Sequence, residues 1–269
     1  MAKKRLDVLL VERGLCESRT RAQALVLEGK VRVAGQVEFK ASRQLDAEVA
    51  LELEQPPRFV SRGGEKLEGA FEKWGLGIRD SGFGIGDSET GGAVLDVEGK
   101  VCLDVGSSTG GFTDCLLQHG AKTVMAVDVG TNQLAYRLRS DPRVWSKENY
   151  NARFMKSEDL PEVPEVAVTD VSFISLRLIL PPIRDVLAPG GLAVALIKPQ
   201  FEVGKGNAPG GLVRDEKLRL EARDGIVRFA TEELGLELLG LAESPIRGKE
   251  MGNVEYLSFW RKRMAVGRW

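Results

Sequence analysis

An acidic and a basic residue in the middle of this sequence each follow an apolar run, in a pattern that could support proton transfer. Asp170 closes the run that begins at Val166, and Lys198 follows the run 192–197. Continuous apolar runs of this length predict buried parallel strands, whose carboxyl ends share one crevice. Burial lowers a lysine pKa and a nearby carboxylate raises it, so the pair could do acid–base work. The alternative is a structural ion pair.

A glycine-rich turn lies in the stretch from Val101 to Asp128. Its order is strand, glycine turn, helix 110–119, second strand and acid, which is typical of a nucleotide-binding βαβ unit. We expect Thr109 to cap the helix and Gly120 to end it. The alternative is an α/β turn that binds nothing.

The spacing of this turn favours one kind of nucleotide. The dinucleotide fingerprint is G-x-G-x-x-G, whereas Ser108 here replaces the second glycine of the run 106–111. Asp104 precedes the first glycine by two residues, and a carboxylate there suits a cationic ligand better than a pyrophosphate. Together with Asp128, it favours S-adenosylmethionine, whose sulfonium and ammonium groups are positive.

The composition is ordinary for a soluble protein. The chain has 269 residues, of which 43% are hydrophobic and 29% charged, and this length predicts about two domains or one large one. No run of about 18 apolar residues is present, so we expect no membrane span. The basic start reaches acidic residues too soon for a signal sequence. Three cysteines without metal-ligand spacing indicate a cytoplasmic protein with reduced thiols and no bound metal. The single histidine, His119, should lie at the end of a helix.

The first 43 residues are locally basic, with ten basic and five acidic residues. A short helix is predicted from Leu6 to Arg13, and a second, 19–27, between a Ser18 cap and a Gly29 stop, followed by strands near 31–33 and 49–53. Arg19 and Arg21 would lie in the first turn of that helix, where the macrodipole disfavours cations, and an RNA phosphate could explain them. A solvated basic face is the alternative.

Two prolines at 56 and 57 indicate a domain boundary. We therefore predict an RNA-binding domain at 1–57, a linker at 58–64 and a catalytic domain at 65–269. A helix should run from Glu65 to Trp74, with Lys66 off its apolar face and exposed. Residues 75–92 hold seven glycines and indicate a flexible loop.

Strands and helices alternate after Val101. This order predicts an α/β fold with a doubly wound, mainly parallel seven-stranded sheet, preceded by a small α/β domain. The expected strands are 101–105, 123–128, 143–148, 166–172, 191–197, 236–243 and 254–260, and the expected helices are 110–119, 132–139, 176–187 and 214–234.

Two resemblances agree with this organisation. Residues 4–52 resemble the RNA-binding domain of a small-subunit ribosomal protein, on the motifs SRTRA and GKVRV. The segments VSRGGEKLEGA, CLDVGSSTGGFTDCLLQHGA, DVSFISL, LIKPQFEVGKG and SPIRGKEMGNVEYL resemble the hemolysin-A/TlyA family of ribosomal RNA 2′-O-methyltransferases, within the FtsJ/RrmJ class. The second resemblance implies a catalytic tetrad of Lys66, Asp170, Lys198 and Glu255, and the first an RNA surface of Arg5, Arg19, Arg21, Lys30 and Arg32.

The resemblance implies methyl transfer from S-adenosylmethionine to a ribose 2′-hydroxyl of ribosomal RNA, at a cytidine, with ribosomal RNA or ribosomal subunits as partners. We expect Lys198 to take or orient the hydroxyl proton. The residues expected at the donor are Asp104, Gly106, Ser107, Gly110 and Asp128, with Asn151 and Asp159 as candidates for adenine. Alternatives are a dinucleotide oxidoreductase, a non-catalytic ribosome-assembly factor and a pore-forming haemolysin, for which no membrane-active segment is visible.

Overall fold

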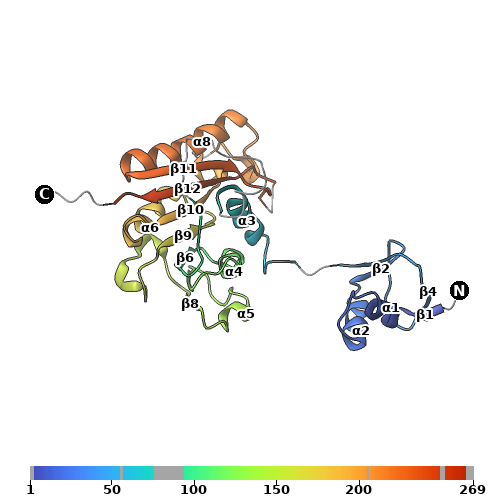
Figure 1. Ribbon diagram of the computed structural model, residues 1–269. Coiled ribbons are helices and arrows are strands. Elements are labelled where there is room, and N and C mark those ends of the chain that lie inside the picture. The colour runs from blue at the N-terminus through green and yellow to red at the C-terminus, as the bar shows by residue number, and fades with distance from the viewer. Residues whose placement is uncertain (1–2, 55–56, 76–93, 205, 249–251, 265–269) are drawn as a thin grey trace. The chain divides into compact units, whose positions relative to one another are not determined.

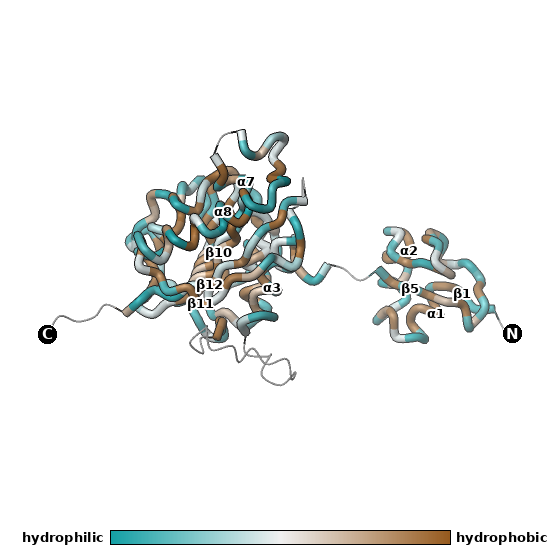
Figure 2. Tube along the Cα trace, turned by 90° about the horizontal axis from the view of Figure 1, so that it is seen from above, coloured by the Kyte–Doolittle hydropathy of each residue, from teal (hydrophilic) through white to brown (hydrophobic). Residues whose placement is uncertain are grey.

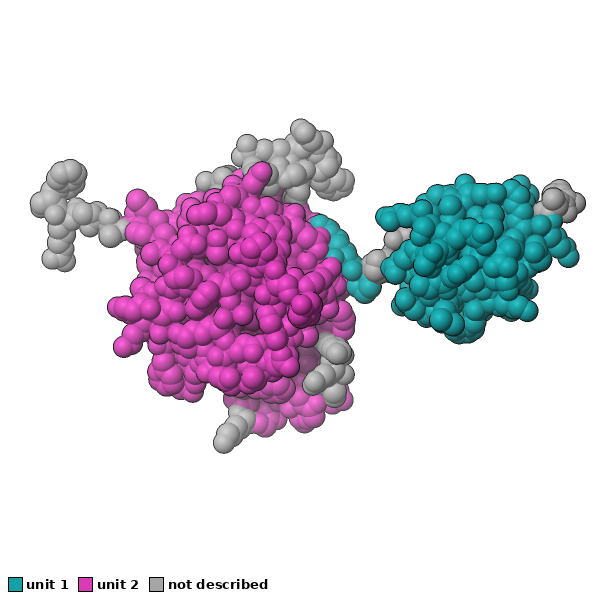
Figure 3. Space-filling view, turned by 90° about the horizontal axis from the view of Figure 1, so that it is seen from below, with its two compact units in different colours: residues 1–58 teal, residues 59–269 magenta. Residues whose placement is uncertain are grey.

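The computed structural model describes residues 3–54, 57–75, 94–204, 206–248 and 252–264, and the chain divides into two compact units, residues 1–58 and 59–269 (Figure 3). Residues 76–92 of the predicted glycine-rich loop lie outside the described residues. Within the described residues, no helix combines the length and the apolar character needed to cross a bilayer.

Unit 1 packs two helices, α1 (Leu6–Glu12) and α2 (Arg19–Leu27), against short strands. β1 (Lys3–Arg5) pairs with β4 (Gln44–Asp46), and β2 (Val31–Val33) pairs with both β3 (Gln36–Val37) and β5 (Leu51–Leu53). The caps of α2 are those predicted, because Ser18 Oγ accepts the Arg21 amide at 3.2 Å and Gly29 has a φ of +71°. The β1–β4 pair was not predicted.

Unit 2 is built on a seven-stranded sheet, counted within the described residues and ordered β11-β12-β10-β9-β6-β7-β8 (Figure 1). Of these strands, β12 alone runs opposite to the others, so the predicted mainly parallel sheet is confirmed. Its strands are β6 (Val101–Val105), β7 (Thr123–Val127), β8 (Val144–Lys147), β9 (Val166–Thr169), β10 (Leu192–Ile197), β11 (Leu236–Glu243) and β12 (Tyr256–Lys262).

Helices cover both faces of this sheet. α3 (Gly63–Trp74) and α4 (Gly111–Gln118) pack on one face, and α6 (Leu180–Val186) and α8 (Glu216–Arg228) on the other. Alternate residues of β6 point to opposite faces, so Cys102 joins one apolar core and Leu103 the other. Figure 2 shows the hydrophobic strands enclosed between these helices.

The predicted helices differ from the observed ones at sites of special backbone geometry. Thr109 is not the cap of α4, since Gly110 takes that position with a φ of +94°, where a Cβ would lie 2.3 Å from Leu138. The predicted helix 132–139 shrinks to α5 (Tyr136–Arg139), because Asn132 adopts a positive φ and its amide is bound by Glu148.

Other boundaries move for local reasons. The predicted helix 176–187 is split into a 3-10 turn (Leu176–Leu178) and α6, which begins with Pro181 and Pro182 in its first turn. α3 begins at Gly63 rather than Glu65, and α8 ends in a π turn (Phe229–Glu233). The short elements are α7 (Pro199–Glu202) and 3-10 turns at Ala152–Phe154, Ser157–Asp159 and Pro209–Gly211.

Candidate active site

The polar residues that follow neighbouring strands meet at one edge of the sheet. Asp170 follows β9 and Lys198 follows β10, whose carboxyl ends lie side by side. Glu255 reaches the same edge from the amino end of the antiparallel β12, since Ile197 pairs with Tyr256. Strand order therefore brings together three residues that are up to 85 positions apart along the chain.

These side chains form an alternating chain of charges with Lys66 of α3. Lys198 Nζ lies 2.6 Å from Asp170 Oδ1, and Lys66 Nζ lies 3.4 Å from Asp170 Oδ2. Lys66 Nζ also donates to Glu255 Oε2 at 2.8 Å. Two amines and two carboxylates balance in charge, which allows Lys66, Lys198 and Glu255 to be buried beside the partly exposed Asp170.

The burial of Lys66 contradicts what its own helix predicts. Its spacing puts Lys66 off the apolar face, so an exposed side chain was expected from that segment alone, but only 8% of the residue is exposed. Glu255, which is 2% exposed, supplies the partner that permits burial. A distant residue thus decides the environment of Lys66.

The glycine turn after β6 lies opposite this cluster. Asp128 holds the turn in place, because its carboxylate accepts the Ser108 amide at 2.7 Å and the Gly130 amide at 2.6 Å. Ser108 has a φ of +47°, so a side chain occupies a left-handed position that commonly takes glycine. At Gly106, also at positive φ, a Cβ would lie 2.9 Å from Val171, so the close packing there requires glycine.

Asp104 is a buried acid, and one of its two carboxylate oxygens has no hydrogen-bond partner among the described residues. It is 1% exposed, and its Oδ2 accepts from Thr113 Oγ1 at 2.6 Å. Its Oδ1 is buried and has no hydrogen-bond partner within the described residues. Burial raises the pKa of Asp104 to about 7, against the opposing effect of the Thr113 hydrogen bond. Such a carboxylate fits a cationic group.

A cavity of about 180 Å³ connects the glycine turn with the Lys198–Asp170 pair. The glycine turn lines one part of it, and Asp170 and Lys198 line another. The remaining lining comes from Ser172 and from the start of α3 and α4, at Ser61, Gly63, Gly111 and Phe112. A ligand on the turn would therefore be presented to the Lys198 amine.

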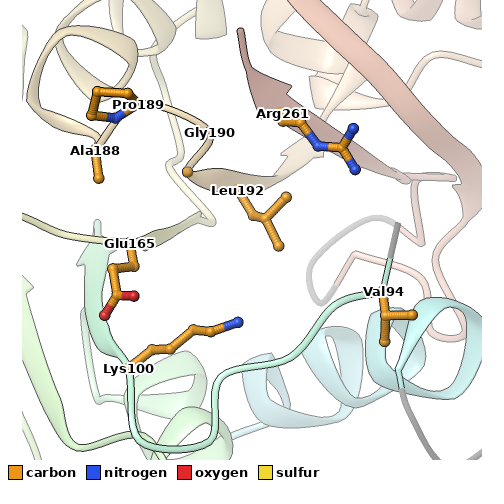
Figure 4. Close-up of a pocket in the computed structure, with 9 residues that line it drawn as sticks. Val94, Lys100, Glu165, Ala188, Pro189, Gly190, Leu192 and Arg261 are labelled. Carbon is orange, nitrogen blue, oxygen red and sulfur yellow. The ribbon is translucent and has the colours of Figure 1, made fainter. Parts of the chain in front are cut away.

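A larger cavity of about 320 Å³ lies at the opposite edge of the sheet, at the amino ends of β6 and β10 (Figure 4). Its charged groups already have partners: Lys100 Nζ donates to the Asp96 carbonyl at 2.9 Å, Arg261 lies 3.3 Å from Glu237, and Glu165 accepts the Val101 amide at 3.2 Å. Ligands of open α/β sheets bind at the carboxyl ends of strands, so the smaller cavity is the better candidate.

Neither of the two predicted adenine contacts is among the residues that line the small cavity. Asn151 Oδ1 accepts the Arg153 amide at 3.1 Å, and Asp159 accepts from Tyr150 at 2.7 Å and from Lys147 at 3.2 Å. These bonds hold the pKa of Asp159 below its usual value. The contact of either residue with adenine stays a prediction.

Two residues beside the cluster were missed by the sequence analysis. Ser172 Oγ accepts from Lys198 Nζ at 2.8 Å, two positions after Asp170. Phe173 is 83% exposed and has a φ of +63°, which is strained for an aromatic residue. Its ring lies 5.2 Å from that of Phe201, on the turn after Lys198. The sequence signal was the pair Ser172-Phe173, close behind the strand that ends at Thr169.

The basic residues of unit 1 are engaged to different degrees. Arg5 makes two hydrogen bonds to buried Asp7, at 3.0 and 2.9 Å, and Arg19 adds a third at 3.2 Å. The position of Arg19 in the first turn of α2 therefore has an internal explanation, which removes the argument that a phosphate must be present. Lys30 pairs with Glu54 at 2.7 Å.

The remaining two candidates in unit 1 have weaker ties. Arg32 reaches the Gly35 carbonyl at 3.4 Å. Arg21 has no acidic partner within 4 Å among the residues that the structure describes, and it is exposed. Arg21 is thus the candidate whose side chain has the fewest hydrogen-bond and ion-pair partners among the described residues of unit 1.

Comparison with known proteins identifies relatives over nearly the whole chain. The FtsJ-like methyltransferase family matches residues 59–262, and the S4 domain family matches residues 4–49. The chain is 40% identical to the 16S/23S rRNA (cytidine-2′-O)-methyltransferase TlyA of Mycobacterium tuberculosis, over 96% of this chain and 89% of that protein. It is 43% identical to hemolysin A of Brachyspira hyodysenteriae, over 94% and 98% of the two chains.

A solved structure of a candidate hemolysin from Streptococcus thermophilus is also similar. It has a TM-score of 0.68 and 41% identity, and the match covers 98% of this chain and 90% of that one. The similarity extends across both units.

Proposed function

Since the chain belongs to the FtsJ-like methyltransferase family, we propose that it transfers a methyl group from S-adenosylmethionine to a ribose 2′-hydroxyl of ribosomal RNA. The observation that carries this proposal is the cavity shared by the glycine turn and the Lys198–Asp170 pair. The S4 match and the name of the mycobacterial relative support ribosomal RNA, or a ribosomal subunit, as substrate and a cytidine as target. The cytoplasm is where such a substrate occurs.

The donor half of the site would be the glycine turn and the acids beside it. The unpaired Oδ1 of Asp104 would accept a hydrogen bond from the ammonium group of the donor. Gly106, Ser107 and Gly110 would lie along the methionine part of the donor. Asp128 would hold the ribose hydroxyls with the lone pairs that its two backbone hydrogen bonds leave available. When bound, the donor supplies an electrophilic methyl group on a sulfonium.

The acceptor half would be the charge chain. Lys198, in its neutral form, would take the proton of the ribose hydroxyl as the oxygen attacks the methyl carbon, and Asp170 would stabilise the ammonium that forms. Ser172 aims the amine through its hydrogen bond. Lys66 and Glu255 would hold Asp170 and the ribose of the RNA in position. General-base help of this kind is typically worth ~10²–10⁴-fold in rate.

The test is methyl transfer measured beside binding. The full chain is incubated with isotopically labelled S-adenosylmethionine and ribosomal subunits or extracted ribosomal RNA, and labelled 2′-O-methyl nucleotides are mapped. Calorimetry measures the binding of S-adenosylmethionine, NAD and RNA to the same protein. We expect incorporation at a cytidine, donor and RNA binding, and no NAD binding.

Lys198→Ala should lose incorporation while it keeps donor affinity, whereas Lys217→Ala, on the exposed face of α8, should behave like wild type. RNA binding without methyl transfer by the wild-type chain would instead indicate an assembly factor. NAD binding without donor binding would indicate an oxidoreductase.

A further inference from the structure

Three side chains of different chemistry converge between α3 and α4, away from the cavity. Glu68 comes from α3, and Cys115 and His119 lie one turn apart on α4 and its C-terminal cap. Their ligand atoms all lie within 4.8 Å of one another. Glu68 Oε2 is 3.6 Å from Cys115 Sγ and 2.8 Å from His119 Nε2. His119 is the single histidine of the sequence.

We propose that Glu68, Cys115 and His119 form a binding site for a divalent transition-metal ion, with Zn²⁺ as the best match. A thiolate, an imidazole and a carboxylate are the three ligand types that zinc takes in proteins. Tetrahedral bonds of ~2.3 Å to sulfur and ~2.1 Å to oxygen place those ligand atoms ~3.6 Å apart. The Glu68–Cys115 distance already has this value.

The distance between the His119 and Glu68 ligand atoms is close to the value that a tetrahedral ion needs. His119 Nε2 and Glu68 Oε2 are hydrogen-bonded, and their separation would grow by roughly half an ångström around a tetrahedral ion. The His119 ring is held for this by Phe71, on which it stacks at 3.8 Å and 9°. Its side chain is 28% exposed, so an ion can enter from solvent and keep a water as fourth ligand.

The sequence could not reveal this site, because its ligands come from two helices. Cys115 and His119 lie four positions apart, but Glu68 lies 47 positions before Cys115. The expectation of no metal rested on the spacing of the cysteines alone, and the proposed site would revise it. The site would fasten α3, which carries Lys66, to α4, which begins at the glycine turn.

The test uses the metal-free full chain and Co²⁺ as a spectroscopic probe. A Co²⁺ titration should give a thiolate-to-cobalt charge-transfer band in the near ultraviolet, saturating at one ion per chain, and Zn²⁺ should displace it. Zn²⁺ should also raise the melting temperature by several degrees. Cys115→Ala should lose the band, and His119→Gln, at a partly exposed helix end, should weaken Co²⁺ binding by at least tenfold.

The matched control is Cys102→Ala, which removes a different buried thiol. Burial raises the pKa of Cys102 to about 12, so this thiol does not supply a thiolate ligand. The control should keep the band. A Co²⁺ complex without a thiolate band, or equal affinity in His119→Gln and wild type, would overturn the proposal and leave a hydrogen-bonded structural cluster. The proposed methyl transfer is tested separately, since none of the three residues lines the cavity.

Discussion

Each unit contains an aspartate bound by two cationic side chains, and the two clusters differ in how the acid is used. In unit 1, Asp7 is fully buried, and its carboxylate accepts hydrogen bonds from Arg5, Arg19 and Gln23. The Arg5 hydrogen bonds hold the pKa of Asp7 well below its usual value. In unit 2, Asp170 lies between Lys198 and Lys66 and is 18% exposed at the cavity.

The type of cation separates a structural cluster from a chemical one. An arginine stays charged throughout the accessible pH range and binds a carboxylate through a rigid fork, so the Asp7 cluster can only hold the chain together. A lysine amine can lose and regain a proton, and the Lys198 amine reaches a cavity. Equal formal charges therefore predict stability in one place and catalysis in the other.

The largest effect should come from Lys198, the proposed general base. Lys198→Met removes the amine but keeps the length of the side chain, and we expect methyl transfer to fall ~10²–10⁴-fold with donor affinity unchanged. Initial rates at saturating donor and RNA measure this. A rate within a few-fold of wild type would show that the Asp170 cluster is structural, like that of Asp7.

The corresponding change in unit 1 should affect folding instead. Asp7→Asn removes the charge that binds Arg5 and Arg19, and should destabilise unit 1 by ~3 kcal/mol. Because the pKa of Asp7 is lowered by folding, its contribution is present above the usual carboxyl pKa and is lost as the pH falls below it. Denaturation of wild type and variant between pH 2 and 7 should show curves that converge in acid.

The control is Asp46→Asn, an exposed acid of the same unit whose loss should change stability little. Donor binding, which belongs to unit 2, should survive both substitutions. Loss of donor binding in Asp7→Asn would mean that the two clusters are not independent.

Asp104 has no cation among its described partners, and it should therefore report on the donor. With a pKa of about 7, its carboxyl group is protonated below neutral pH, so affinity for the donor's ammonium should fall up to tenfold per pH unit below 7. The folded pKa is raised, so the stabilisation of the donor-free protein by this proton is present in acid and is lost as the pH rises through 7. Calorimetric titrations with S-adenosylhomocysteine from pH 5.5 to 8.5 measure the affinity.

Asp104→Asn should bind the donor ~10-fold more weakly at pH 8 and lose the pH dependence, because the amide carries no charge. A profile that is the same in wild type and variant would assign the dependence to another group.

The smallest effect should come from Arg21, an exposed arginine that does not bind Asp7. Arg21→Ala should weaken RNA binding a few-fold and reduce the slope of log K against log salt by about 1, without a change in melting temperature. Arg5→Ala should instead lower the stability of unit 1 through Asp7. Salt titrations of RNA binding by both variants distinguish a phosphate contact from a structural ion pair.

The sequence by itself determined the order of strands, the glycine turn and the residues that close the strands. Apolar runs identify buried strands such as β9 and β10, because both of their faces are covered. The alternation of strands and helices located the other strands of the sheet. Parallel strands share a carboxyl edge, and for that reason Asp170 and Lys198 could be paired before the structure was known.

Only the tertiary structure decided which partner each charge has. Lys66 looked exposed on its helix and is buried because Glu255, 189 positions away, meets it. Arg19 looked available for a phosphate and is bound by Asp7. Glu68 had no visible relation to the helix that carries Cys115 and His119. Periodicity describes one element at a time, whereas the environment of a charge depends on elements that meet only after folding.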